Sequence, residues 1–344
     1  MSLISLLKKK NKKLLFTTPS HCGKVFLMHK FYQWYKYDIS EVDAYNPQQA
    51  LKVAECNASA IYNTKSTHFL TNGSTSGILA SVLTCCHKND KLLIWDNAHP
   101  CHENAGLLAG AEIIKYKMPF NIEWGIYMPV TPLELEKYLA KYFPQAIIIT
   151  SPTYEGMVAD IESIKQLCSK YNTRLIVDEA HGALYPFSKE LPLSAINYAD
   201  FTIQSLHKTA GGINPTALLH CNSDLDPKPA LNLITTTSPS YPMLATIEAN
   251  INFLNSNKGK MHIIDLITEI KYVKSKLTNF DFYGDDITKI LIKKSGMSGY
   301  ELSDLLFNKF NIEDERTNEK STMLLTGIGT TKQKIQSLLK LKNL

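Results

Sequence analysis

Arginine, paired cysteines and long apolar runs are scarce in this sequence. Arg174 and Arg316 are the only arginines, so 35 of the 37 basic residues are lysines. No apolar run approaches the ~18 residues of a membrane-spanning helix. The seven cysteines are odd in number and include no C-x-x-C pair, which argues against a disulfide framework. We therefore predict a protein of the reducing cytoplasm.

The rest of the composition is that of an ordinary globular protein. The chain has 344 residues, 44% hydrophobic and 20% charged, which suffices for one large and one smaller domain. Its net charge of +5 is spread along the chain, apart from a lysine-rich run at residues 8–13. That run follows a short apolar stretch, the reverse of a signal peptide, and we interpret it as a solvated helix end. A membrane-surface or nucleic-acid anchor is the alternative, but we expect neither kind of partner.

Strands and helices alternate from residue 67 onward. Seven apolar segments are predicted as strands, at residues 67–70, 91–95, 112–116, 146–150, 175–178, 201–205 and 216–220. Helices of about ten residues are predicted between most of them, at 76–86, 101–109, 132–142 and 161–171. This alternation predicts an α/β fold with a mostly parallel seven-stranded sheet covered on both faces.

The composition changes after a further predicted helix at 241–255, becoming rich in lysine and asparagine. Strands at 289–293 and 322–326, with helices at 300–310 and 331–339, predict a small α+β C-terminal domain. We divide the chain into an N-terminal segment (1–62, with a helix at 48–62), a large domain (63–258) and a small C-terminal domain (259–344).

Two neighbouring strands end in residues of complementary chemistry. Asp178 ends one apolar strand, and Lys208 follows the next, three residues after Ser205. Ligands of open α/β sheets bind at the carboxyl ends of the strands. Pyridoxal phosphate (PLP) needs a lysine for its Schiff base and a carboxylate that keeps its ring nitrogen protonated. The pair therefore predicts a PLP site.

Other turns that follow strands carry groups suited to a phosphate. In the strand-to-helix turn at 71–77, Gly73, Ser74 and Thr75 offer backbone N–H groups and hydroxyls. Ser205 and His207 flank Lys208, and residues 235–241 are rich in hydroxyls. Each segment alone is equally consistent with a plain turn, but together they indicate one site.

The segment at 96–103 follows another strand and has two interpretations. Zinc is one, since the segment holds His99, Cys101, His102 and Glu103. A structural zinc site needs four ligands, however, and no second cluster has matching spacing, so we predict no metal. We favour the other interpretation, in which the His99 imidazole lies flat against a cofactor ring.

Together these motifs resemble the bacterial ornithine/lysine/arginine decarboxylases, which are fold-type-I PLP enzymes. The resemblance runs from about Phe16 to Leu339, and its motifs lie at 16–24, 69–77, 97–99, 152–156, 178–182, 205–209, 236–241, 299–302 and 328–331. It implies a short member of the family without the N-terminal wing domain of the large members. Residues 210–215 and 313–319 depart from the family pattern.

The resemblance also implies roles for individual residues. The catalytic set is Lys208, Asp178, His99 and His181, with Lys208 as the Schiff-base lysine and Asp178 at the ring nitrogen. His99 and Ala180 contact the two faces of the ring, and Ser151 donates to the ring hydroxyl. The phosphate is bound by Gly73, Ser74, Thr75, Ser205 and His207. A homodimer completes each site, so Thr237 and Ser238 are expected to reach the partner's cofactor.

The implied reaction is decarboxylation of lysine, ornithine or arginine to the amine and CO2. Aminotransferases usually clamp the substrate carboxylate with an arginine of the small domain, and here only Arg316 is available. The scarcity of arginine therefore favours decarboxylation. Another PLP reaction, such as transamination or aldol-type cleavage, is one alternative, and a non-catalytic PLP-binding regulatory protein is another.

Overall fold

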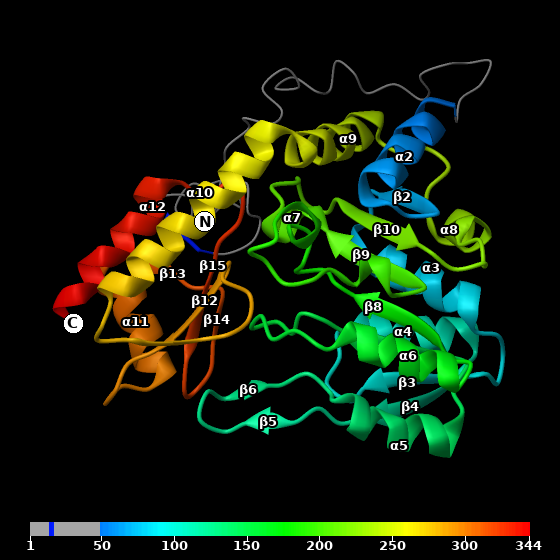
Figure 1. The fold of residues 1–344 in the computed structure, drawn as a ribbon, viewed down its shortest axis with the longest axis horizontal. Helices are drawn as coiled ribbons and strands as arrows, with labels where there is room; N and C mark the ends of the chain where they lie inside the picture. Colours follow the sequence, from blue (N-terminus) through cyan, green and yellow to red (C-terminus); the bar gives the residue numbers. More distant parts are fainter. Residues whose placement is uncertain (1–13, 17–48) are drawn as a thin grey trace, which may run out of the picture.

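The computed structural model describes residues 14–16 and 49–344. Figure 1 shows a large sheet enclosed by helices and, beside it, a smaller sheet built from the C-terminal part of the chain. The large sheet has seven strands, and the smaller one has four. The predicted α/β fold class is therefore confirmed.

The large sheet has the strand order β2-β10-β9-β8-β7-β3-β4. Its strands are β2 (Ser66–Leu70), β3 (Lys91–Trp95), β4 (Glu112–Tyr116), β7 (Ala146–Thr150), β8 (Arg174–Asp178), β9 (Phe201–Ser205) and β10 (Ala217–Cys221). β10 runs antiparallel to both its neighbours, and the other pairs are parallel. The carboxyl ends of six strands therefore lie at one edge of the sheet, the edge at which a ligand site is expected.

Helices cover both faces of this sheet because alternate strand residues point to opposite sides. Ile148 of β7 packs toward α3 (Gly73–Cys85), α4 (Pro100–Ala109) and α8 (Lys228–Ile234). Its neighbours Ile147 and Ile149 pack toward α5 (Pro132–Tyr142) and α6 (Ile161–Lys170). Each fully buried aliphatic side chain contributes ~1.5–3 kcal/mol, so slippage of a strand by one residue would be costly.

The smaller sheet is antiparallel, with the order β11-β12-β15-β14. Its strands are β11 (Asp281–Tyr283), β12 (Lys289–Lys293), β14 (Arg316–Thr317) and β15 (Thr322–Leu325). The remaining α-helices are α2 (Gln49–Tyr62), α7 (Leu206–Thr209), α9 (Tyr241–Asn255), α10 (Asn257–Lys276), α11 (Gly299–Lys309) and α12 (Lys332–Gln336). Two short strand pairs lie outside the two sheets: β1 (Leu14–Leu15) pairs with β13 (Ile312–Glu313), and β5 (Phe120–Asn121) pairs with β6 (Ile126–Tyr127).

Helix α10 is the largest element that the sequence analysis does not anticipate. Ile263, Leu266, Ile267 and Ile270 recur at helical spacing along it and are buried. The Ser256 hydroxyl caps the helix by accepting the Gly259 N–H at 3.1 Å. Four of its lysines, Lys258, Lys260, Lys271 and Lys276, are exposed, so part of the lysine-rich composition belongs to the solvent side of a long amphipathic helix.

Glu179, directly after β8, is a buried carboxylate that ties the end of this strand to its surroundings. Its side chain accepts hydrogen bonds from Ser194 Oγ at 2.7 Å, the Ala195 N–H at 2.7 Å and Gln204 Nε2 at 2.6 Å. Burial nevertheless raises the pKa of Glu179 to about 7. The folded protein therefore holds a proton here more tightly than the unfolded chain does.

We predict that Glu179 makes folding stability fall as the pH rises from about 4.5 to about 7, its unfolded and folded pKa values. Glu179→Gln removes this titration, so between pH 5 and pH 8 the wild type should lose roughly 3 kcal/mol of stability relative to the variant. Urea unfolding at the two pH values measures the difference. Parallel pH dependences would contradict the prediction, and Glu190→Gln, at an exposed site, is the control.

Candidate active site

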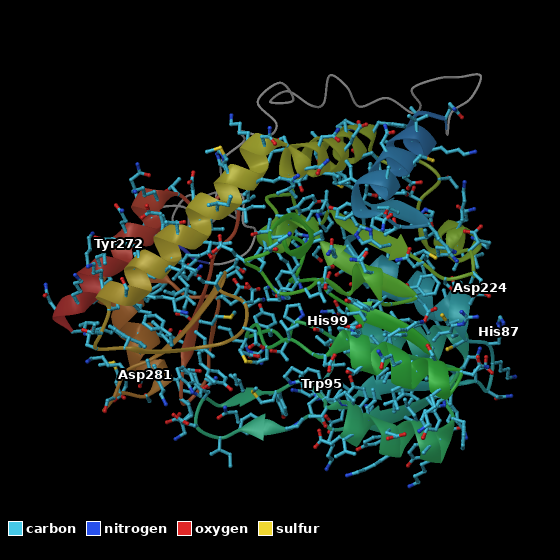
Figure 2. The ribbon with its side chains drawn as sticks, viewed as in Figure 1. His87, Trp95, His99, Asp224, Tyr272 and Asp281 are labelled. Carbon is cyan, nitrogen blue, oxygen red and sulfur yellow. The ribbon has the colours of Figure 1, made fainter. Side chains whose placement is uncertain are left out.

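A cavity of about 520 Å³ opens at the carboxyl ends of the parallel strands. Figure 2 labels two of its residues, Trp95 and His99, near the middle of the molecule between the two sheets. Nine of the predicted site residues line it: Gly73, Ser74, Thr75, His99, Asp178, Ala180, His181, His207 and Lys208. Residues far apart in the sequence are thus brought together because their strands end at the same edge.

Lys208 lies in α7, the short helical turn that follows β9. Its Nζ is 3.0 Å from Nε2 of His181. Burial lowers the pKa of Lys208, although the nearby Asp178 opposes this. Burial also lowers the pKa of His181 well below its usual value, and the charge of Lys208 adds to the effect. An uncharged His181 is therefore suited to accept a hydrogen bond from the Lys208 ammonium.

Asp178 is 8% exposed and is held by two donors. The Ala180 N–H donates to Oδ1 at 3.1 Å, and His102 Nε2 lies 2.9 Å from Oδ2. Burial alone would raise the pKa of Asp178, but the hydrogen bond from His102 and the charge of the nearby Lys208 hold it below its usual value. The site therefore contains an ionised carboxylate.

The sequence analysis considered His102 only as a possible zinc ligand and missed this contact. His102 is three residues after His99, a spacing that puts both on one face of a helix. That spacing was the available indication that His102 lies near the site. Its contact with Asp178 of β8 is formed only in the folded protein. Among residues 14–16 and 49–344, no cluster of His, Cys, Asp or Glu could hold a metal ion.

The protonation of His99 follows from its own contacts. His99 is the N-cap of α4, and its Nδ1 accepts the Cys101 N–H at 3.3 Å. The Cys101 Sγ is also 3.0 Å from Nδ1, and burial raises the pKa of this thiol to about 12, so the thiol keeps its proton. Burial lowers the pKa of His99. His99 is therefore a neutral ring with its proton on Nε2.

One end of the cavity is suited to an anion. Gly73 begins α3 with a φ of 74°, a left-handed conformation that favours glycine, and Ser74 and Thr75 follow it. The first N–H groups of a helix have no partner within the helix, and the helix dipole favours negative charge there. His207 lies beside them and donates from Nδ1 to the Thr216 carbonyl at 3.1 Å.

Four predicted cofactor contacts do not line this cavity. Ser151 is 2% exposed, and its Oγ accepts the Ala159 N–H at 3.0 Å. Ser205 is fully buried, and among the described residues its Oγ has no partner. Thr237 and Ser238 are exposed in the loop between α8 and α9. Most of the predicted motif at 16–24 lies outside the described residues, since only its first residue is described.

Around Tyr154, the cavity carries charged side chains to which the sequence analysis assigned no role, apart from Arg316, which was weighed as a carboxylate clamp. The Arg316 guanidinium lies 4.8 Å from the ring centroid of Tyr154, and its Nε is 3.3 Å from Glu155 Oε1. The Tyr154 hydroxyl donates to Glu315 Oε1 at 2.7 Å, and its ring meets His181 edge-on at 4.8 Å.

A second buried lysine lies next to Tyr154. Lys289 of β12 is 1% exposed and donates to the Tyr154 carbonyl at 3.1 Å. Burial lowers its pKa to about 8, although Asp286 and Glu155 oppose the shift. The smaller sheet therefore supplies both Lys289 and Arg316 to the region around Tyr154.

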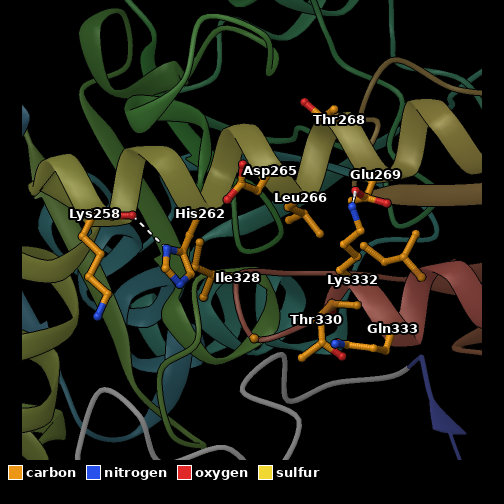
Figure 3. A pocket seen from close by; sticks show the side chains of 13 residues that line it. Lys258, His262, Asp265, Leu266, Thr268, Glu269, Ile328, Thr330, Lys332 and Gln333 are labelled. Carbon is orange, nitrogen blue, oxygen red and sulfur yellow. Dashed lines mark hydrogen bonds and ion pairs between the residues drawn. The ribbon is translucent and has the colours of Figure 1, made fainter.

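A second cavity, of about 600 Å³, lies between α10 and residues 328–335 (Figure 3). The pair Lys332 and Glu269 spans it, and His262 donates from Nδ1 to the Lys258 carbonyl at 2.9 Å. None of the predicted site residues lines it. We therefore assign the candidate active site to the cavity at the strand ends.

The residues of that cavity fit PLP. Lys208 offers an amine to an aldehyde, Asp178 an anion to the ring nitrogen, and α3 with His207 donors to a phosphate. Among the described residues, Trp95 Nε1 and Thr150 Oγ1 are buried without a hydrogen-bond partner, and both residues line the cavity. The cavity thus has unused polar groups as well as the donor and acceptor set that the cofactor needs.

We predict that borohydride treatment of the PLP-loaded protein fixes the cofactor on Lys208, because this amine faces the cavity and burial lowers its pKa. Peptide mass spectrometry identifies the labelled lysine. Lys208→Ala should abolish the label and leave the circular dichroism spectrum unchanged. A label on Lys289, the other buried lysine nearby, would contradict the assignment.

Comparisons with known proteins agree with this site. A model of the family described as "Orn/Lys/Arg decarboxylase, major domain" matches residues 3–290. The chain is 31% identical over 316 residues to the uncharacterized protein YaaO of Bacillus subtilis, covering 85% of this chain and 65% of that protein. It is 30% identical over 299 residues to an arginine decarboxylase of the same organism, covering 79% and 60%.

Solved structures resemble the fold. The lysine decarboxylase LdcF of Francisella novicida superposes with a TM-score of 0.80 at 18% identity, covering 92% of this chain and 54% of that one. The ureidoglycine-glyoxylate aminotransferase of Bacillus subtilis superposes with a TM-score of 0.70 at 12% identity. The chain thus spans about half to two thirds of the length of YaaO, the arginine decarboxylase and LdcF. It belongs to the Orn/Lys/Arg decarboxylase family, and its cofactor is pyridoxal phosphate.

Proposed function

We propose that this protein decarboxylates a basic amino acid, namely lysine, ornithine or arginine, to the corresponding amine and CO2. The observation that carries the proposal is the meeting of Lys208 and Asp178 in a cavity that Glu155 also lines, with Glu315 and Asp286 nearby. Arginine decarboxylases among the relatives support it.

The proposal assigns one task to each residue near the reacting bond. PLP, when bound, accepts the electron pair that a substrate bond at the α-carbon releases. Asp178 would keep a negative charge opposite the ring nitrogen, and His99 and Ala180 would confine the ring between them. His181 Nε2, 3.0 Å from Lys208 Nζ, holds the lysine amine in place and exchanges a proton with it.

The charges around Tyr154 suit a cationic substrate side chain. Glu155 and Arg316 line the cavity there, and Glu315, Asp286 and Lys289 lie close by without lining it. Carboxylates outnumber cations among these five groups, in a largely buried region where opposite charges attract more strongly than in water. A lysine, ornithine or arginine side chain would complete the balance.

Transamination is the second candidate, and Arg316 is the observation that favours it. Arg316 lines the cavity, as an arginine that clamps a substrate carboxylate would have to do. Its Nε already faces Glu155, however, and its plane lies over Tyr154. This partial compensation of its charge supports decarboxylation, in which the carboxylate must leave. A non-catalytic PLP-binding protein is the remaining alternative.

A homodimer is part of the proposal. Thr237 and Ser238 lie outside the cavity of their own chain and are exposed, which suits residues that contact a second copy. An isologous interface would bring both loops to both sites at once. We also propose a cytoplasmic location, supported by the cysteines, since the six within the described residues are all unpaired. No described helix is long and apolar enough to cross a membrane.

We predict that the PLP-loaded protein releases CO2 from at least one of L-lysine, L-ornithine and L-arginine. L-Norleucine, which has the chain of lysine without its amine, should release none, because it cannot balance the carboxylates. Trapped CO2, amine and keto acid are measured in one assay. Keto acid without CO2 would show transamination, and no product with any amino acid would favour the non-catalytic alternative.

The same assay tests the shared site. If Thr237 and Ser238 act in the partner's cavity, the activity per subunit should fall when the protein is diluted below the dissociation constant of the dimer. Sedimentation at the same concentrations reports the mass. A fully active monomer would contradict the dimeric part of the proposal and leave the reaction unaffected.

A further inference from the structure

Helix α4 carries a second histidine, His102, which lies behind Asp178, the carboxylate proposed to pair with the cofactor. His102 is completely buried, and its Nε2 lies 2.9 Å from Asp178 Oδ2. The other ring nitrogen, Nδ1, is buried and has no hydrogen-bond partner among the described residues. His102 does not line the cavity and therefore acts through Asp178.

These contacts determine where the proton of His102 resides. The carboxylate of Asp178 is an acceptor, so Nε2 must donate to it. A second proton on Nδ1 would create a buried cationic ring with an N–H that has no acceptor, which is costly. A lone pair on Nδ1 avoids this cost. The neutral Nε2–H tautomer therefore satisfies the geometry, and the negative charge of the pair stays on Asp178.

Two donors from different elements then fix the rotation of the Asp178 carboxylate. The Ala180 N–H, from the turn after β8, takes Oδ1, and His102, from α4, takes Oδ2. His99 begins the same helix, and its Nδ1 is also unprotonated because it accepts from Cys101. One helical turn therefore orients both the ring-stacking histidine and the ring-pairing carboxylate.

We infer that His102, as the neutral Nε2–H tautomer, is a positioning residue that fixes the orientation and the charge of Asp178 for pairing with the ring nitrogen of PLP. The inference rests on the cofactor site of the proposed function, and it is independent of which amino acid reacts. Without His102, Asp178 keeps one donor in a buried setting, where a proton would neutralise it more readily.

The first test reads the tautomer in the wild-type holoprotein. Histidines labelled with ¹⁵N in the ring are observed by long-range ¹H–¹⁵N correlation at pH 8, and the His102 signals are assigned by their loss in His102→Gln. We expect a protonated Nε2 and an unprotonated Nδ1. A doubly protonated ring, or a proton on Nδ1, would overturn the inference.

The second test measures PLP affinity by titrating the apoprotein and following cofactor absorption. His102→Leu should weaken binding by about 10-fold or more, the scale of one lost hydrogen bond to a charged group. His102→Gln, whose amide can donate to Asp178, should restore affinity to within a few-fold of the wild type. Wild-type affinity in His102→Leu, or no rescue by glutamine, would overturn the inference.

His220 provides a matched control. It is 1% exposed on β10 and contacts Thr67 Oγ1 at 3.0 Å and Gln204 at 3.3 Å, with no contact to Asp178. His220→Leu should therefore leave PLP affinity unchanged. If it lowers PLP affinity as much as His102→Leu does, the effect of His102→Leu is general destabilisation and the inference is wrong. If PLP affinity depends on His102 but the protein releases no CO2, the proposed function is wrong and this inference still holds.

Discussion

The site depends on keeping one carboxylate ionised inside the protein. An isolated buried carboxylate would take up a proton, so Asp178 needs donors and a counter-charge. The donors are His102 on α4 and the Ala180 N–H in the turn after β8, and the counter-charge is Lys208 after β9. The charge therefore depends on the docking of α4 onto the sheet and on β8 lying beside β9.

Different parts of the fold supply the charged groups of the cavity. The N-terminus of α3, with Gly73 and His207 beside it, favours an anion at one end. Arg316 of the smaller sheet also lines the cavity, beside Glu155, and the buried Lys289 donates to the Tyr154 carbonyl without lining it. The large sheet thus supports cofactor binding, while residues from the smaller sheet face the position of the substrate in the proposal.

Much of this arrangement could be predicted from the sequence. The strands are short apolar runs that end in polar turns, and the polar residues at parallel strand ends must share one edge. Asp178, Lys208 and His99 are therefore predictable as neighbours, and the structure brings them to one cavity. Helix α10 was missed because its many lysines masked the helical spacing of its buried isoleucines.

The rest depends on tertiary contacts that no local pattern encodes. His102 lies 76 residues from its partner Asp178. Arg316 belongs to a stretch with weak family resemblance, yet β14 places it at the cavity. Ser151 was expected to donate to the ring hydroxyl; its Oγ accepts the Ala159 N–H, and the residue does not line the cavity. Thr237 and Ser238, also expected to contact a cofactor, lie outside the cavity of their own chain.

The most direct measurement of the central role of Asp178 is the turnover of Asp178→Asn. Asparagine keeps the size of the side chain and removes its charge, so the ring nitrogen of PLP loses its anionic partner while Lys208 is unchanged. The account predicts a fall in kcat of ~10²-fold or more, the usual scale for removing one preorganised electrostatic partner. A kcat within a few-fold of the wild type, with PLP still joined to Lys208, would contradict it.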